Sequence, residues 1–121
     1  MMSETQEQIR LFEWALSERS RFPDLKLMYH IPNEGKRDSK NAAILKKMGL
    51  KRGVPDVHLP VARGPYHSLY IEMKRIAEAD TTEAQDWWLS QLRQQGNCAV
   101  VCYGWKSAAA TIEWYLKGAR T

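Results

Sequence analysis

Three ionisable residues lie where a small sheet would normally place apolar side chains. Asp56 begins one strand candidate, over residues 56–61, and Glu72 and Lys74 lie inside a second, over residues 68–74. Residues two apart on a strand share a face, so the Glu72 carboxylate and the Lys74 ammonium stand side by side. If the two strands pair, Asp56 comes close to Glu72. The pattern therefore predicts two acids and one base at a single point of the sheet.

Burying such charges costs several kcal/mol unless a partner compensates, and two arrangements would do so. One is an ion pair between Glu72 and Lys74 at a sheet edge. The other is a divalent cation between Asp56 and Glu72, since two adjacent carboxylates repel unless one is protonated or a cation separates them. Hard oxygen ligands suit Mg²⁺ or Mn²⁺. Such an ion can activate a water and stabilise charge on a phosphate, with Lys74 at hand to assist.

The cysteines and histidines point to no zinc site. Cys98 and Cys102 lie four apart in an apolar run, too far apart along a strand to form a disulfide. We expect buried thiols in a reducing cytoplasm, and the polar, acidic N-terminus does not read as a secretory signal. The three histidines show no ligand spacing for zinc. They are His30, His58 and His67.

The 121 residues predict one domain, residues 1–121, with 44% apolar and 26% charged side chains typical of a globular protein. No apolar run approaches the roughly 18 residues of a membrane span. Hydrophobic spacing and capping signals predict an α/β domain with a mixed central sheet flanked by helices. The expected helices cover residues 3–20, 38–48, 82–95 and 107–116, and the expected strands cover 27–31, 56–61, 68–74 and 98–103. Ser3 is expected to cap the first helix and Gly49 to end the second, with Met48 facing inward. The continuously apolar strand over 98–103 is expected to be buried and covered on both faces.

Pro55-Asp56 followed after fifteen residues by Glu72-Met73-Lys74 resembles the signature of the PD-(D/E)xK nucleases. A lone Glu-x-Lys triplet is weak, but further segments resemble the VRR-NUC family over nearly the whole chain, and its short stand-alone phage and bacterial members above all. These segments are Glu4-Thr5-Gln6-Glu7-Gln8, Ile31-Pro32-Asn33, Lys51-Arg52-Gly53-Val54-Pro55-Asp56, Tyr70-Ile71-Glu72-Met73-Lys74, Gln85 and Val101-Cys102-Tyr103-Gly104-Trp105.

The resemblance implies a restriction-endonuclease-like fold and metal-dependent cleavage of DNA phosphodiester bonds. A first-helix glutamate joins the metal site in that family, and Glu7 is the best match. Glu4 is the second candidate, and a solvated charge serving the helix dipole is the alternative. Gln85 matches a glutamine that orients the lysine or a phosphate. Gln85 also fits a capping box with Thr82, and we expect both roles together only if the helix begins elsewhere.

A basic segment precedes Pro55-Asp56. Residues 36–52 carry seven basic side chains and one acid, a net charge of +6 in a chain of net charge +4. Such a patch favours a polyanionic partner, with a solvated helix face as the alternative. The residues expected to contact nucleic acid are Asn33, Lys36, Arg37, Lys40, Lys47, Lys51 and Arg52. Phosphate contacts carry no sequence information, so we expect recognition of DNA shape.

The resulting hypothesis is a Mg²⁺- or Mn²⁺-dependent, structure-specific endodeoxyribonuclease of the bacterial or phage-infected cytoplasm. The resemblance implies a homodimer that cuts branched DNA such as four-way (Holliday) junctions. The adjacent Trp87 and Trp88 cannot both face one core, so one is exposed at an interface or lies flat on the domain. Val101-Cys102-Tyr103 replaces the Val-Arg-Arg triplet of the family. The alternatives are a non-catalytic DNA-binding module and a structural domain with a surface ion-pair ladder.

Overall fold

The computed structural model describes residues 2–32, 39–76 and 80–120, and these form the predicted α/β fold. Four strands lie in the order β1-β2-β3-β4 within one sheet. They are β1 (Tyr29–His30), β2 (Val57–Leu59), β3 (Leu69–Lys74) and β4 (Cys98–Tyr103). The first three are antiparallel neighbours, whereas β3 and β4 run parallel. The mixed sheet is confirmed, and β3 is one of its central strands.

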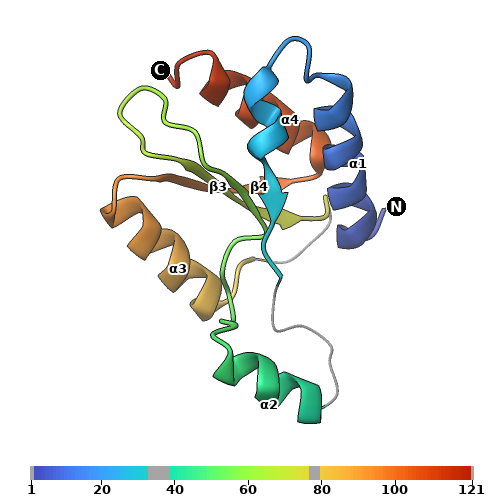
Figure 1. Ribbon diagram of the computed structural model, residues 1–121, viewed down its shortest axis with the longest axis vertical. Coiled ribbons are helices and arrows are strands. Elements are labelled where there is room, and N and C mark those ends of the chain that lie inside the picture. Colours follow the sequence, from blue (N-terminus) through green and yellow to red (C-terminus); the bar gives the residue numbers. More distant parts are fainter. Residues whose placement is uncertain (1, 33–38, 77–79, 121) are drawn as a thin grey trace.

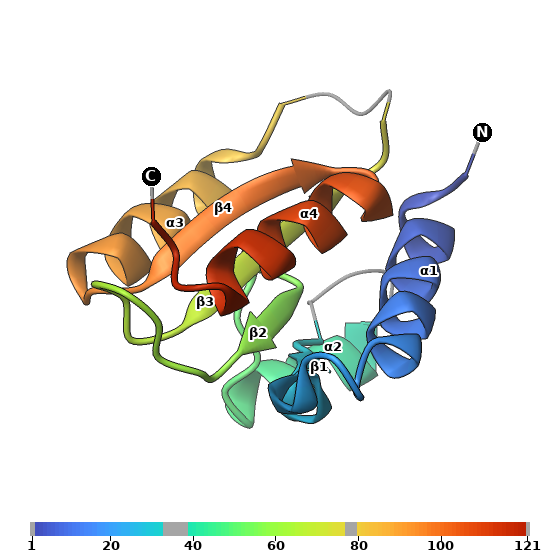
Figure 2. The same ribbon diagram turned by 90° about the horizontal axis from the view of Figure 1, so that it is seen from above.

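Helices cover both faces of this sheet. The helical elements are α1 (Glu4–Ser17), the short 3₁₀ helix η1 (Pro23–Leu27), α2 (Ser39–Lys47), α3 (Glu83–Gln94) and α4 (Trp105–Leu116). Helices α1 and α4 pack together on one face, and α3 lies on the other, where it makes the crossover between the parallel strands (Figure 1). Helix α2 stands apart from both layers in Figure 1, and the view from above shows β4 between α3 and α4 (Figure 2).

Alternation along β3 separates the core from the site. Leu69, Ile71 and Met73 are buried against the α1 and α4 layer, where Ile112 and Tyr115 are fully buried. The intervening Glu72 and Lys74 point to the opposite side of the strand. Burial of these apolar side chains is the main contribution to the stability of the domain. The packed core face of β3 therefore holds the backbone of Glu72 and Lys74 in a fixed position.

Three helix ends follow the predicted signals, whereas α1 ends at Ser17 rather than at residue 20 and α4 begins at Trp105 rather than at residue 107. Ser3 and Thr82 both form complete capping boxes, so α1 and α3 begin where the sequence indicates. Gly49, with a φ of +103°, ends α2. The amide of Gly49 donates to Lys46 O, and the amide of Leu50 donates to Leu45 O. This pair of bonds is the Schellman motif, which needs the left-handed residue that glycine supplies.

Three local expectations need correction. The strand expected over residues 27–31 shrinks to Tyr29–His30, because the chain from Pro23 to Leu27 forms η1 instead. Met48, expected to face inward, is 77% exposed because α2 does not lie on the core. Strand β4 is covered by α3 and α4 as expected, yet it lies at the sheet edge and Tyr103 is exposed. No helix in the described ranges is both long and apolar enough to cross a membrane.

Candidate metal centre

Three carboxylates from distant parts of the chain converge at one point. One oxygen each from Glu4, Asp56 and Glu72 lies within 4.8 Å of the other two. Glu4 comes from the first turn of α1, Asp56 from the approach to β2, and Glu72 from the middle of β3. Asp56 and Glu72 are buried and Glu4 is half-buried. This grouping needs the full tertiary fold, since 51 residues of chain separate Glu4 from Asp56.

The backbone around Asp56 is held tightly. Gly53 has a φ of +88°, and a Cβ built there would lie 2.7 Å from the carbonyl carbon of Ala84. Only glycine fits so close to the start of α3. The Asp56 carbonyl accepts a hydrogen bond from Ile31 N at 2.7 Å, and its Oδ2 accepts one from Met73 N at 2.8 Å. The Asp56 carboxylate is therefore fixed against β3.

Glu72 is held by one of its two oxygens. Its Oε2 accepts a hydrogen bond from Gln85 Nε2 at 3.3 Å. Its Oε1 is buried and has no hydrogen-bond partner among the described residues. A buried acceptor without a partner costs about 1–3 kcal/mol, and more when it is charged. That oxygen is one a cation would satisfy.

The side-chain amide of Gln85 makes two contacts at once. Its Oε1 accepts from Thr82 N at 2.9 Å, while its Nε2 reaches Glu72. The helix still begins at Glu83 with Thr82 as its N-cap. The two ends of the Gln85 amide thus serve the helix cap and Glu72 separately, and the role of Gln85 toward Lys74 or a phosphate stays a prediction. The side chain that Gln85 contacts here is Glu72.

The electrostatics of the cluster favour a proton or a cation that Asp56 and Glu72 share. Burial, reinforced by the Asp56 charge alongside, raises the pKa of Glu72 from 4.5 to about 9. Lys74, which is 7% exposed and two residues along β3, acts in the opposite direction. One proton or one cation must therefore lie between the two acids near neutral pH. Three hard oxygen donors and an unpartnered buried oxygen fit a divalent cation.

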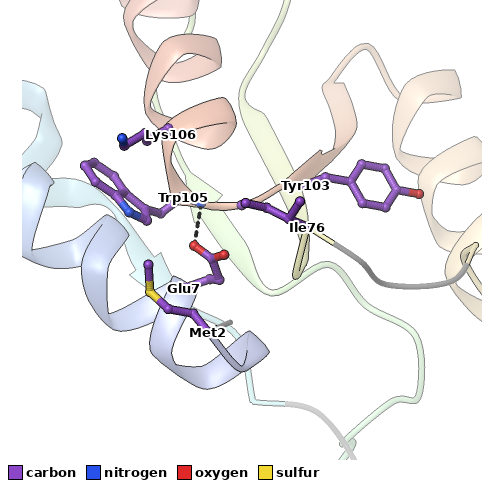
Figure 3. Close-up of a pocket in the computed structure, with 7 residues that line it drawn as sticks. Met2, Glu7, Ile76, Tyr103, Trp105 and Lys106 are labelled. Carbon is purple, nitrogen blue, oxygen red and sulfur yellow. Dashed lines mark hydrogen bonds between the residues drawn. The ribbon is translucent and has the colours of Figure 1, made fainter.

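Glu7 lies outside this carboxylate cluster. It is 2% exposed, and its Oε1 accepts a hydrogen bond from Trp105 N at 3.0 Å, as Figure 3 shows. Gly104, the N-cap of α4, has no side chain to cap the helix, so the Glu7 carboxylate caps α4 instead. The structure thus groups Glu4, the second candidate, with Asp56 and Glu72.

The cluster is open to solvent on the α1 side. A cavity of about 250 Å³ is lined by Glu4, Thr5, Gln8, His30 and Asp56. A second cavity, of about 200 Å³, lies beyond Glu7 and is lined mostly by apolar atoms, including those of Met2, Ile76 and Trp105 (Figure 3). Of the two cavities, the first is the one that Glu4 and Asp56 line.

The comparisons with known proteins agree with this architecture. The family model of the VRR-NUC domain matches residues 2–106 of this sequence. The chain belongs to the VRR-NUC family. A solved structure described as a VRR_NUC domain protein is 32% identical to this chain, with a TM-score of 0.82, and the match covers 97% of this chain and 90% of that one. A search of the curated proteins gave no match. This VRR-NUC protein is accordingly a member of a nuclease family with a nuclease-like fold.

The nucleic-acid contacts expected for this VRR-NUC chain fall into two groups. Four of these residues are exposed on or just after α2, namely Lys40, Lys47, Lys51 and Arg52. The expectations for Asn33, Lys36 and Arg37 lie outside the described residues. Of the adjacent tryptophans, Trp87 is 57% exposed and Trp88 is half-buried.

The raised pKa of Glu72 predicts an unusual pH dependence of stability. The folded protein keeps a proton up to about pH 9 that the unfolded chain releases near 4.5. The metal-free protein should therefore lose stability as pH rises through this interval, by at most about 1.4 kcal/mol per pH unit. A divalent cation replaces the proton, so the gain in Tm on adding one should grow with pH.

Thermal unfolding in EDTA between pH 5 and pH 9 measures this effect, with Glu72→Gln as the matched variant. Glutamine does not titrate, so its curve should be flatter than that of the wild type over the same range. Parallel curves for the two proteins would show that Glu72 is not the group responsible.

Proposed function

We propose that this VRR-NUC protein is a divalent-metal-dependent endodeoxyribonuclease that hydrolyses phosphodiester bonds in branched DNA. The observation that carries the proposal is the convergence of Glu4, Asp56 and Glu72 beside Lys74, with one buried oxygen of Glu72 lacking a partner in the described residues. A surface ion-pair ladder does not explain it, because β3 is a central strand.

Glu4, Asp56 and Glu72 would hold Mg²⁺ or Mn²⁺. When bound, such an ion supplies a water of lowered pKa and neutralises charge on the phosphate. Asp56 is suited to direct binding because its other oxygen is already fixed by Met73 N. Gln85 holds Glu72 in place, which keeps the carboxylate oriented in the way that outer hydrogen bonds orient metal ligands.

Lys74 would act on the reacting groups. Its side chain shares a strand face with Glu72 and is nearly buried, so its ammonium group is confined near the cluster. From there it can donate to the attacking water or to a non-bridging phosphate oxygen as negative charge develops. Water would attack phosphorus in line with the leaving oxygen, and the bond from phosphorus to that oxygen would break. The attacking water gives up a proton to solvent and the leaving oxygen takes one up, so the products are a phosphate end and a free hydroxyl end.

The proposed substrate follows from charge and size. The exposed Lys40, Lys47, Lys51 and Arg52 would bind phosphates without reading bases. A homodimer would present two such sites related by a two-fold axis, as two strands of a four-way junction require. The exposed Trp87, packed edge-on against Trp88, would suit an interface. The free, buried Cys98 and Cys102 are compatible with action in the cytoplasm of a bacterium or an infected host.

A cleavage assay tests the function directly. A labelled four-way junction and a linear duplex of the same sequence are incubated with the protein in Mg²⁺, in Mn²⁺ and in EDTA. We expect nicked junction products with either ion, little cutting of the duplex, and no product in EDTA. Salt-sensitive binding to both DNAs without product at any metal concentration would instead support the non-catalytic DNA-binding module.

A further inference from the structure

The outward side of α2 combines lysines with large apolar side chains. Lys40, Ile44, Lys47 and Met48 recur at the i, i+4, i+7 and i+8 positions, so they lie on one face. All four are exposed, and Ile44 and Met48 remain 49% and 77% exposed. On the other side of the helix, Ala42 and Leu45 are half-buried. This exposed surface is called the outer face of α2 below.

The exposure does not come from a frayed helix end. The two hydrogen bonds of the Schellman motif close α2 after Met48, whose own amide donates to Ile44 O at 3.0 Å. Yet α2 stands away from the sheet layers (Figure 1), and no other element in the described ranges packs extensively against it. A nine-residue helix is marginal by itself in water, so an ordered α2 with an exposed apolar stripe indicates a partner.

The positive charge of α2 indicates what kind of partner binds it. Within the resolved span of α2 there are three lysines and no acid, and Lys51 and Arg52 follow directly. The same face of a second copy would repel these charges, whereas a polyanion would attract them. Only three residues lie between Arg52 and Asp56, so a polyanion held by Lys51 and Arg52 would lie close to the candidate metal centre.

We propose that the outer face of α2 binds DNA at a branch point, with Lys40 and Lys47 on the phosphates and Ile44 and Met48 wedged against an opened base step. The inference rests on the proposed function and specifies how the same nuclease selects its substrate. Inserting an apolar wedge costs a few kcal/mol per unstacked step. That cost is smallest where pairing is already interrupted, so the wedge favours a branch over a continuous duplex.

The test measures DNA binding in EDTA, where no cleavage takes place, with 2-aminopurine placed at the branch or at the centre of a linear duplex. The wild type should raise the fluorescence of the branch probe, because the base becomes unstacked. Ile44→Ser and Met48→Ser should abolish this rise and weaken junction binding about tenfold, with duplex binding unchanged. Leu16→Ser is the matched control, since Leu16 is 63% exposed on α1.

The lysines should behave differently. Lys40→Gln and Lys47→Gln should weaken binding to junction and duplex alike, and each should lower the salt slope by about one unit. Lys117→Gln, an exposed lysine after α4, is their control. Thermal unfolding of every variant shows that it is folded.

Two results would overturn the inference. One is unchanged branch fluorescence and junction affinity in both apolar variants. The other is a loss of dimer mass in Met48→Ser by sedimentation, with DNA binding intact, which would make the outer face of α2 an interface between copies. The nuclease proposal can fail independently of this inference. A wild-type protein that binds the branch and unstacks its bases, but cuts no DNA, would contradict the nuclease proposal and still support the apolar wedge.

Discussion

Asp56→Asn is expected to lower the rate of junction cleavage by at least about a thousandfold while leaving the protein folded. Metal-assisted charge stabilisation contributes several kcal/mol to such reactions, and about 4 kcal/mol corresponds to that factor. Asparagine keeps a carbonyl oxygen, so it can still accept the hydrogen bond from Met73 N that fixes this side chain. The change therefore removes charge from the metal centre with little change in shape.

The measurement is single-turnover cleavage in saturating Mg²⁺, together with junction affinity in EDTA. Asp86→Asn is the matched control, because Asp86 is exposed on α3 and bonds to Thr81 away from the cluster. DNA affinity should be equal or slightly stronger in Asp56→Asn, as a negative charge is lost. Cleavage within tenfold of the wild type would remove Asp56 from the chemistry.

Glu4→Gln and Glu7→Gln are expected to differ sharply in their effects on metal binding and cleavage, although the two residues lie one turn apart on α1. Glu4 belongs to the carboxylate cluster, so Glu4→Gln should weaken Mn²⁺ binding by at least the roughly 10- to 100-fold that is typical of losing an outer hydrogen bond. Glu7 caps α4 through its Oε1, a role that the amide oxygen of glutamine can retain. Glu7→Gln should therefore keep metal affinity and cleavage within a few-fold.

Glu7→Ala completes this comparison. Removing the cap should cost about 1 kcal/mol of stability and lower Tm by several degrees. Titration calorimetry with Mn²⁺ and thermal unfolding in EDTA give the two readouts independently. If Glu7→Gln abolished metal binding while Glu4→Gln preserved it, the ligand assignment would be reversed.

Much of the fold follows from local patterns in the sequence. The capping boxes at Ser3 and Thr82 and the glycine at 49 set helix ends through contacts within a few residues, and such signals are readable without tertiary context. The alternation along β3 likewise separates Glu72 and Lys74 from the core. The approach of Asp56 to Glu72 follows once β2 and β3 pair, because their register fixes the distance.

The choice between Glu4 and Glu7 could not be made in this way. Both lie on the same face of α1, three residues apart, so helical periodicity treats them alike. What separates them is the position of α1 along α4, where Glu7 meets the bare backbone at Gly104. The sequence does hold one signal, a helix start at Gly104-Trp105 with no capping side chain, which requires an acceptor from elsewhere.

The exposure of Met48 also could not be predicted from helical periodicity. Apolar residues at helical spacing predict which side of α2 is apolar, but not whether this chain or a partner covers it. In the structure, Ala42 and Leu45 take the half-buried side and Met48 the exposed one. Contacts with a partner macromolecule lie beyond what periodicity encodes.

The most direct test of the shared metal centre is the anomalous difference map of a crystal soaked in Mn²⁺. We expect a strong peak in coordinating contact, at about 2.1 Å, with carboxylate oxygens of Asp56 and Glu72, and with Glu4 as the third ligand. A peak that touches only one of Asp56 and Glu72, or none between them at saturating Mn²⁺, would contradict it.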